Sequence, residues 1–422
     1  MAEAVPAEAT EGLRAHLDAS PSPWHAVRTS ATALDAAGFT ALDERAPWTE
    51  VPDAGYVQRG GALVAWRRPP AGGAVPLHIV GAHTDSPGLR IKPHPDGSGA
   101  GWRQLGVEIY GGVLLNSWLD RDLGIAGRLV FADGSDSLVD VAEPIARVPQ
   151  LAIHLDRDVN ERGLVLDRQA HMAPIWATAL DASFEEWIAE RAGGGVPAAW
   201  ELCLYDVQPS AVLGADRSLL ASGRLDNLVS CWAATTALVA ADPTEHVAMI
   251  ALFDHEEVGS ASTAGASGPF LATIIERLND TTGGTRDDLH RVLAASSCVS
   301  ADNAHAVHPN YPERHDPGHG PIVNHGPAIK LNVNQRYATS ADTAVLFGRA
   351  CEDAGVPFQT FVSRNNVPCG STIGPLTATR LGISTVDIGV PQLSMHSARE
   401  VCGTADPVWL AAALTSYLTG PP

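Results

Sequence analysis

Acidic and histidine side chains recur in this sequence directly after apolar runs, which is where a buried strand would end. The clearest case is FDHEEVGS, in which Glu256 and Glu257 follow the run AMIALF. Two adjacent carboxylates repel each other, and burying them costs free energy unless a positive charge compensates. Taken alone, this stretch is explained best by a solvated strand end, so its function has to be judged together with the other strand ends.

Similar residues occupy four further places along the chain. They are His83 and Asp85 in GAHTDSP, Asp226 in SGRLDN, Asp302 in SADNAHAVHPN and His396 in QLSMHSARE. Each has an ordinary explanation alone, such as a turn or a helix cap, but five coincident places are much less expected by chance. In open α/β sheets, ligands bind outside the carboxyl ends of the strands, so we expect these side chains to converge on one site.

The chemistry of this set points to divalent metal ions. Two histidines and several carboxylates are hard or borderline donors, which suit two ions such as zinc, manganese or cobalt better than a thiolate site does. Two metals about 3.5–4 Å apart can share a bridging carboxylate and clamp a water molecule, while one carboxylate must stay free to take the proton of that water. Neighbouring side chains on an extended strand point to opposite sides, so we expect Glu256 and Glu257 to divide these two tasks.

Composition excludes several other classes of function. The chain has 422 residues, 45% of them apolar, and a formal net charge of -20, which argues against nucleic acid or an anionic membrane surface as a partner. No apolar run approaches the length that spans a bilayer, and the N-terminus does not resemble a secretory signal. The six cysteines form no CxxC pair. We therefore expect a cytoplasmic enzyme with reduced thiols.

The order of elements predicts an α/β fold with an insertion. Two amphipathic helices near the N-terminus, and the alternation of helices and strands from Leu225 onward, favour a mostly parallel central sheet flanked by helices. Between them the pattern changes to short β segments such as GRLVFADG and LAIHLD, while KPHPDGSGAGW is typical of a loop. The simplest division is an α/β domain of residues 1–90 and 222–422, interrupted by a β-rich domain of residues 91–221.

Six stretches carry a resemblance to a known family. GAHTDSP, SGRLDN, DHEEVGS, SADNAHAVHPN, KLNVNQRYA and MHSARE resemble, in this order, the motifs of the aspartyl aminopeptidase and vacuolar aminopeptidase I family of dinuclear zinc metallopeptidases. The resemblance covers almost the whole chain. It implies that the inserted domain serves dimerisation, that the subunits form a tetrahedral homododecamer, and that the substrates are peptides with a free N-terminus.

The resemblance also implies a role for each residue of the site. Glu256 would be the general base, and Asp85 would orient His83 from behind the metals. A cis peptide bond would join Asp226 to Asn227. Two zinc ions per subunit would be held by His83 and Asp302, by Glu257 and His396, and by a bridging Asp226.

Four more residues would contact the substrate according to the resemblance: His154, His305, Lys330 and Tyr337. A preference for Asp or Glu at the substrate N-terminus is expected, and it needs a local cation because a chain of charge -20 repels acidic peptides. Lys330, one of only two lysines, is the candidate. A preference for neutral residues, a di-zinc deacylase or carboxypeptidase, and a non-enzymatic shell or cargo protein that keeps its metal site stay open as alternatives.

Overall fold

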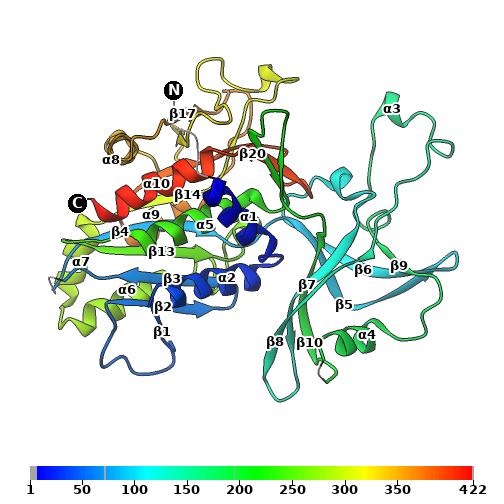
Figure 1. Ribbon diagram of the computed structural model, residues 1–422, viewed down its shortest axis with the longest axis horizontal. Coiled ribbons are helices and arrows are strands. Elements are labelled where there is room, and N and C mark those ends of the chain that lie inside the picture. Colours follow the sequence, from blue (N-terminus) through cyan, green and yellow to red (C-terminus); the bar gives the residue numbers. More distant parts are fainter. Residues whose placement is uncertain (1–6, 71–72, 194, 421–422) are drawn as a thin grey trace.

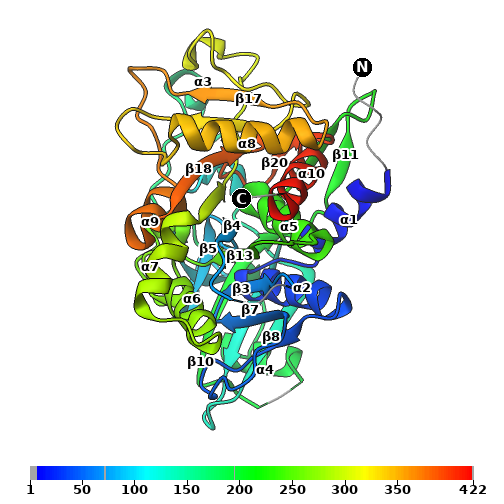
Figure 2. The same ribbon diagram turned by 90° about the vertical axis from the view of Figure 1, so that its left-hand side faces the viewer.

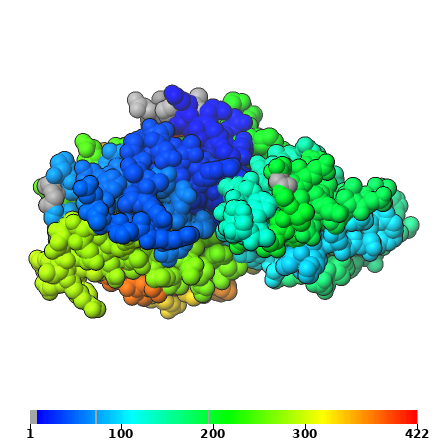
Figure 3. All heavy atoms as spheres, turned by 90° about the horizontal axis from the view of Figure 1, so that it is seen from below, coloured from blue at the N-terminus to red at the C-terminus, as the bar shows by residue number. Residues whose placement is uncertain are grey.

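The computed structural model describes residues 7–70, 73–193 and 195–420, whose strands form three sheets. Figure 1 shows a larger α/β part, which contains the first and the last described helices, beside a β-rich part made of residues from the middle of the sequence. Figure 3 shows that the β-rich part forms one end of an elongated molecule. The predicted fold class, an α/β domain interrupted by a separate β-rich domain, is confirmed.

A nine-stranded sheet lies at the centre of the larger part, in the order β1-β2-β3-β13-β4-β14-β18-β16-β17. The four middle strands, β13, β4, β14 and β18, run parallel to one another. Strands β4 and β13 are buried along their whole length, as expected for parallel strands that are covered on both faces. The strands of this sheet are β1 Thr40–Ala41, β2 Ala54–Arg59, β3 Ala62–Arg67, β4 Leu77–His83, β13 Val247–Phe253, β14 Ser297–Ala301, β16 Ala328–Leu331, β17 Gln359–Val362 and β18 Ser384–Gly389.

Helices cover the two faces of this sheet, and alternate residues of each strand serve opposite faces. Val80 and Ile250 pack against one group of helices, whereas Ile79 and Met249 pack against the other. Figure 2 shows the two groups on either side of the sheet. Among the described residues, no helix is long and apolar enough to cross a membrane. The first group is α1 Ala7–Asp18, α2 Pro23–Ala36, α5 Leu225–Ala240, α8 Ala341–Asp353 and α10 Asp406–Thr419, and the second is α6 Phe270–Thr281, α7 Arg286–Ala295 and α9 Ile373–Leu381.

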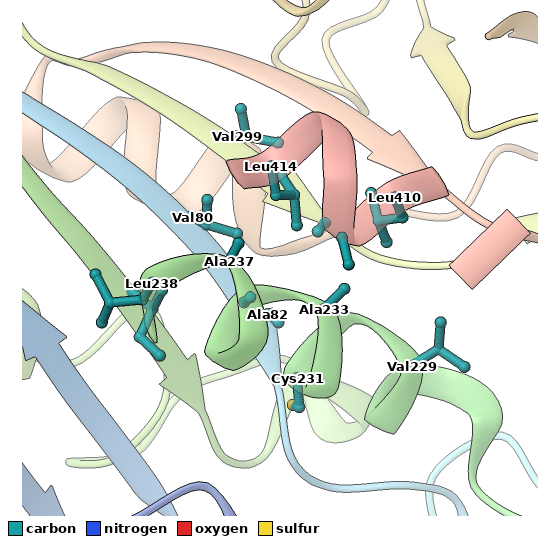
Figure 4. Close-up of a cluster of buried hydrophobic side chains, with 14 of the residues drawn as sticks. Val80, Ala82, Val229, Cys231, Ala233, Ala237, Leu238, Val299, Leu410 and Leu414 are labelled. Atoms are coloured by element: carbon teal, nitrogen blue, oxygen red, sulfur yellow. The ribbon is translucent and has the colours of Figure 1, made fainter. Parts of the chain in front are cut away.

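Small side chains allow α5 to lie close to α10 and to the sheet. Ala233 and Ala237 are four residues apart, so they lie on one side of α5, and both are fully buried. Figure 4 shows them in one apolar cluster with Leu410 and Leu414 of α10. This packing fixes the N-terminal end of α5, where Asp226 lies.

The β-rich part is built around a six-stranded sheet in the order β8-β7-β10-β5-β6-β9. Its core includes Phe184 and Ile188 of α4, a helix that begins with a capping box at Ser183. The predicted bounds at residues 91 and 221 stay a prediction, and this sheet favours an inserted domain from Gly88 to Asp206. Its elements are β5 Gly88–Gly99, β6 Trp102–Tyr110, β7 Leu123–Val130, β8 Asp136–Ala146, α3 Val159–Arg162, β9 Ile175–Ala177, α4 Phe184–Arg191 and β10 Ala199–Asp206.

Two local predictions for the inserted domain are wrong. KPHPDGSGAGW is not a loop, because β5 continues through most of it, with a register shift between Ile91 and Asp96 that accommodates two prolines. LAIHLD is not a strand but a series of turns. Its apolar residues Leu151, Ile153 and Leu155 imitate the alternation of a strand, yet they are exposed and no described strand pairs with them.

A third sheet of five short strands was not expected from the sequence. Its order is β11-β12-β20-β19-β15. β12 precedes Asp226, β15 follows Asp302, and β19 precedes His396, so this small sheet joins three segments that carry candidate ligands. Its strands are β11 Ala211–Leu213, β12 Leu219–Ser222, β15 Ala304–His305, β19 Pro391–Leu393 and β20 Glu400–Gly403.

Two histidines stack at the end of the sheet opposite to the carboxyl ends of β4 and β13. The ring centroids of His78 and His246 are 3.8 Å apart, and the ring of Tyr417 also stacks on His78, with its centroid at 4.9 Å. His78 Nδ1 lies 2.8 Å from the carbonyl oxygen of Tyr417. Burial and the neighbouring His246 lower the pKa of His78 to about 4. His78 is therefore neutral in the folded protein near neutral pH.

Stability should fall on acidification because the unfolded chain protonates His78 below about pH 6.5, whereas the folded chain does so only near pH 4. In this window one such group contributes up to about 1.4 kcal/mol per pH unit. The variant His78→Asn keeps a donor for Tyr417 but cannot titrate, so its thermal midpoint should fall less between pH 6.5 and 5 than that of the wild type. The exposed residue His290 provides the control, since His290→Asn should follow the wild type. Equal pH slopes for His78→Asn and wild type would contradict this account.

Candidate active site

The carboxyl ends of the central strands carry the predicted residues. His83 is the last residue of β4, and Asp302 follows β14 directly, and both side chains are buried. Asp226 lies in the first turn of α5, where its backbone and that of Asn227 are not yet helical. The peptide bond between Asp226 and Asn227 is cis, as the resemblance implies. His396 follows β19 and completes the set from the small sheet.

Glu256 and Glu257 reach the site in a way that differs from the prediction. They do not alternate along an extended strand, because β13 ends at Phe253 and residues Glu256–Val258 form a 3-10 turn. The chain turns at His255, whose φ of 63° is unusual for a residue other than glycine. The two carboxylates are therefore placed by this turn and not by the pleat of a strand.

The two imidazoles face different oxygens of one carboxylate. His83 Nε2 lies 3.4 Å from Asp226 Oδ1 and 3.7 Å from Asp302 Oδ1. His396 Nε2 lies 3.6 Å from Asp226 Oδ2 and 3.4 Å from Glu257 Oε2. Each of these two groups of three residues brings its donor atoms close enough to hold one metal ion. Asp226 belongs to both groups, which is the arrangement that a bridging ligand requires.

Asp85, which follows β4, contacts both the ring of His83 and the turn that carries Glu256 and Glu257. Its carboxylate accepts hydrogen bonds from the backbone N–H groups of Glu256 and Glu257, at 3.0 and 3.1 Å. It also accepts one from the hydroxyl of Tyr110, at 2.7 Å. Nδ1 of His83 lies 3.0 Å from the backbone carbonyl oxygen of Asp85 and 3.4 Å from its carboxylate Oδ1. The buried side chain of Asp85 thus contacts His83, the turn of residues 256–258 and Tyr110.

The pKa values of the cluster indicate an excess of negative charge. Burial, together with the charges of nearby carboxylates, raises the pKa of Glu256 to about 7. Burial and the charge of Asp226 raise the pKa of Glu257 well above its usual value. Burial lowers the pKa of His396, but hydrogen bonding to Asp226 and the charge of Glu257 outweigh it and raise the pKa to about 10. Each of these raised pKa values means that the site binds a proton, or another cation, more readily than the same groups would in water.

The donor atoms fit zinc ions. Tetrahedral zinc with ligands at 2.0–2.1 Å keeps neighbouring donors about 3.3 Å apart, and the shortest separations here are 3.4 Å. Asp226 Oδ1 and Glu257 Oε1 are buried and accept no hydrogen bond from the described residues. Leaving such oxygens without a partner is costly, and a cation between the donors would remove that cost. The six cysteines are free thiols, and none of them belongs to these groups.

Three of the predicted substrate-binding residues lie beside this cluster. Lys330 on β16 is buried, with its Nζ 3.9 Å from Asp302 Oδ2 and 5.3 Å from the centre of the Tyr337 ring. Tyr337 and His305 line a pocket of about 330 Å³. Further basic side chains of the pocket lining are His308, Arg314, His315 and Arg364. The pocket next to the candidate metal centre is thus rich in basic groups.

His154, the fourth predicted substrate residue, does not join the cluster within this subunit. It is exposed, and it lies in the turns of residues 151–156 in the inserted domain. The next element along the chain is α3, which Figure 1 shows at the far end of the inserted domain, away from the central sheet. A role of His154 at an active site would have to involve another subunit.

Three further positions, which were not predicted from the sequence, contact the cluster. Glu400, at the start of β20, accepts hydrogen bonds from the backbone N–H groups of Asp226 and His396. Tyr110 donates to Asp85, and the carbonyl oxygen of Gly112 lies 3.0 Å from Nδ1 of His396. The signal for Glu400 was its place in MHSARE, four residues after a candidate ligand. Tyr110 and Gly112 gave no signal, because they belong to the inserted domain and meet the site only in the folded chain.

Comparison with known proteins agrees with this geometry. The family model described as aminopeptidase I zinc metalloprotease (M18) matches residues 16–417. The chain belongs to the M18 family. The probable M18 family aminopeptidase 2 of Streptomyces coelicolor is 52% identical over 419 residues, which are 97% of each chain.

Solved structures agree with the family assignment. The crystal structure of prApe1 has a TM-score of 0.91 and 29% identity, over 97% of this chain and 93% of that one. The S. cerevesiae mApe1 dodecamer has a TM-score of 0.85 and 28% identity, over 97% of this chain and 96% of that one. The chain is therefore an M18 metalloaminopeptidase, and zinc is the metal of its family.

Proposed function

We propose that this M18 enzyme uses two metal ions to release Asp or Glu from the N-terminus of peptides. The observation that supports two ions is the position of Asp226, with one oxygen toward each imidazole. His83 and Asp302 would hold one ion, Glu257 and His396 the other, and Asp226 would bridge them. Zinc is proposed as the native metal, with manganese and cobalt as alternatives for the same donors.

Zinc ions at these positions would lower the pKa of bound water from 15.7 to about 7 and polarise the scissile carbonyl. Glu256 would take a proton from that water and return it to the leaving amine. The carboxylate of Asp85 would hold Glu256 in place through the backbone N–H, and the carbonyl and carboxylate oxygens of Asp85 would together fix the ring of His83 at Nδ1. His305, which lines the adjacent pocket, would donate a hydrogen bond to the tetrahedral oxyanion.

The proposed preference for acidic residues rests on Lys330. Its ammonium is the buried cation beside the candidate metal centre, and the ring of Tyr337 lies against it. A carboxylate of the substrate would gain a charge-assisted hydrogen bond there, which a neutral side chain could not make. The basic side chains that line the neighbouring pocket would add to this attraction.

We also propose a homododecamer in which the inserted domain pairs two subunits. The support is an exposed apolar surface on this domain, since such surfaces mark protein–protein contacts, and the dodecameric assembly of the similar mApe1. His154 is exposed and stands between the exposed residues Ile153 and Leu155 in the sequence, and the proposed pairing would bring it to the active site of the neighbouring subunit. The apolar residues of the surface are Leu151, Ile153, Leu155, Leu164 and Val165.

The two adjacent glutamates should respond differently to the same substitution. Glu256→Gln should retain its metal but lose roughly two to four decades of kcat, the usual range for a general base. Glu257→Gln should weaken metal binding, because it removes a ligand. Metal analysis of the purified variants, together with steady-state kinetics, checks both expectations. Equal metal loss in the two variants would contradict this division of roles.

Substrate preference can be measured with aminoacyl anilides and the zinc-reconstituted enzyme. The wild type should cleave Asp and Glu derivatives faster than Leu, and N-acetylated derivatives should resist cleavage because the free amine is required. Lys330→Met should lower the ratio of Asp to Leu cleavage, whereas Lys92→Met should leave that ratio unchanged. An unchanged ratio in Lys330→Met would show that another group selects the acidic residue.

Complementation tests whether His154 serves the neighbouring subunit. His154→Phe and Glu256→Gln should each be nearly inactive as pure oligomers. Co-expression should restore about a quarter of the wild-type activity, because half of randomly formed pairs are mixed and one of their two sites has both groups. If His154 acted within its own subunit, no mixed site would be complete, and the mixture would stay as inactive as its parents.

A further inference from the structure

Glu400 connects two of the residues proposed as metal ligands. Its side chain is buried, with Oε2 accepting a hydrogen bond from the backbone N–H of Asp226 at 3.0 Å. Its other oxygen, Oε1, accepts one from the backbone N–H of His396 at 2.7 Å. The two ligands come from different elements that are far apart in the sequence. One carboxylate therefore sets the distance between their backbones.

Buried amide side chains hold Glu400 itself in place. Gln392 donates from Nε2 to Glu400 Oε1 at 3.3 Å and accepts from Asn303 Nδ2 at 3.0 Å. Asn303 directly follows Asp302, and it also donates to the carbonyl oxygen of Leu225 at 2.8 Å. These bonds link the chain segments next to three candidate ligands into one network, with Glu400 at its centre.

The backbone of His396 gives a further reason for this contact. Its φ is 66°, a conformation that residues other than glycine seldom adopt and that the surrounding structure must stabilise. The bond from this N–H to Glu400 acts at the residue that has the unusual backbone. The ring of His396 has a contact of its own, because the carbonyl oxygen of Gly112 lies 3.0 Å from its Nδ1. The imidazole is thus fixed through its backbone and through its ring.

We propose that Glu400 is a positioning residue of the metal centre, which holds Asp226 and His396 at the separation that metal binding requires. It contacts neither substrate nor reacting atoms, and it acts only through the backbones of these two residues. Asp85 has the same relation to the turn that carries Glu256 and Glu257. This inference rests on the proposed metal ligands. It gives the stretch MHSARE two functional residues, His396 as a ligand and Glu400 as a positioning residue.

Glu400→Gln provides the test, because the amide has nearly the same shape but its nitrogen cannot accept a hydrogen bond. One of the two backbone N–H groups would lose its acceptor. Competition with a chromophoric chelator should show zinc affinity weakened about 10- to 100-fold, the usual effect of losing such a partner of a metal ligand. The absorption spectrum of the cobalt-substituted protein should change as well. The control Glu352→Gln makes the same carboxylate-to-amide change on the exposed face of α8 and should alter neither measurement.

A purely structural role would lower the thermal midpoint of Glu400→Gln without changing its zinc affinity or cobalt spectrum, and that result would overturn the inference. Glu400→Asp keeps both carboxyl oxygens but is too short to reach both N–H groups, so it should also bind zinc more weakly. This second variant decides the matter if Glu400→Gln does not fold. The zinc content of the wild type tests the proposed two-metal site separately. One ion per wild-type subunit would contradict that proposal, while the affinity ratio between wild type and variant would still test the role of Glu400.

Discussion

Negative charge concentrated at the carboxyl ends of the central strands is the constraint on which the rest of this structure depends. In the part of the chain that the structure describes, Asp226, Asp302 and the glutamate pair share the two imidazoles of the cluster, so their repulsion has to be offset by cations and by N–H donors. Asp85 and Glu400 bring two more carboxylates to the region, but each of them is directed at backbone N–H groups. The fold thus supplies hydrogen-bond donors to these two carboxyl groups itself, and the others are left for metal ions.

Positioning such a cluster requires more than the parallel sheet. The strands of the nine-stranded sheet place His83 and Asp302, whereas the short strands of the third sheet bring His396 and Glu400 to the same point. Asp226 lies in the first turn of α5, a helix that packs against α10, and its backbone N–H donates to Glu400. Each ligand therefore depends on a different part of the chain, and their convergence is a property of the complete fold.

The parts that were predictable from the sequence share a physical basis. Long apolar runs such as AMIALF form strands buried on both faces, and the polar residues after them meet because parallel strands end at the same edge. The remaining features depend on contacts that no local pattern reveals. The strands of the third sheet are too short to show an alternating pattern of apolar residues. The turn at Glu256 depends on a hydrogen bond to Asp85, which follows a different strand. LAIHLD alternates like a strand, but its apolar residues face outward with no strand beside them.

The hydrogen bonds that Tyr110 and Gly112 make across the domain boundary have a consequence for the design of smaller enzymes. The segment of residues 110–114 belongs to the chain of the inserted domain, yet it contacts both Asp85 and His396. The insertion is thus not a detachable module: its sheet is separate from those of the larger domain, but its apolar core includes Ala398 from the C-terminal part of the chain. A minimal peptidase built from the α/β part alone would lack part of the framework around its own metal centre, and a graft of that centre onto another scaffold would have to include these five residues.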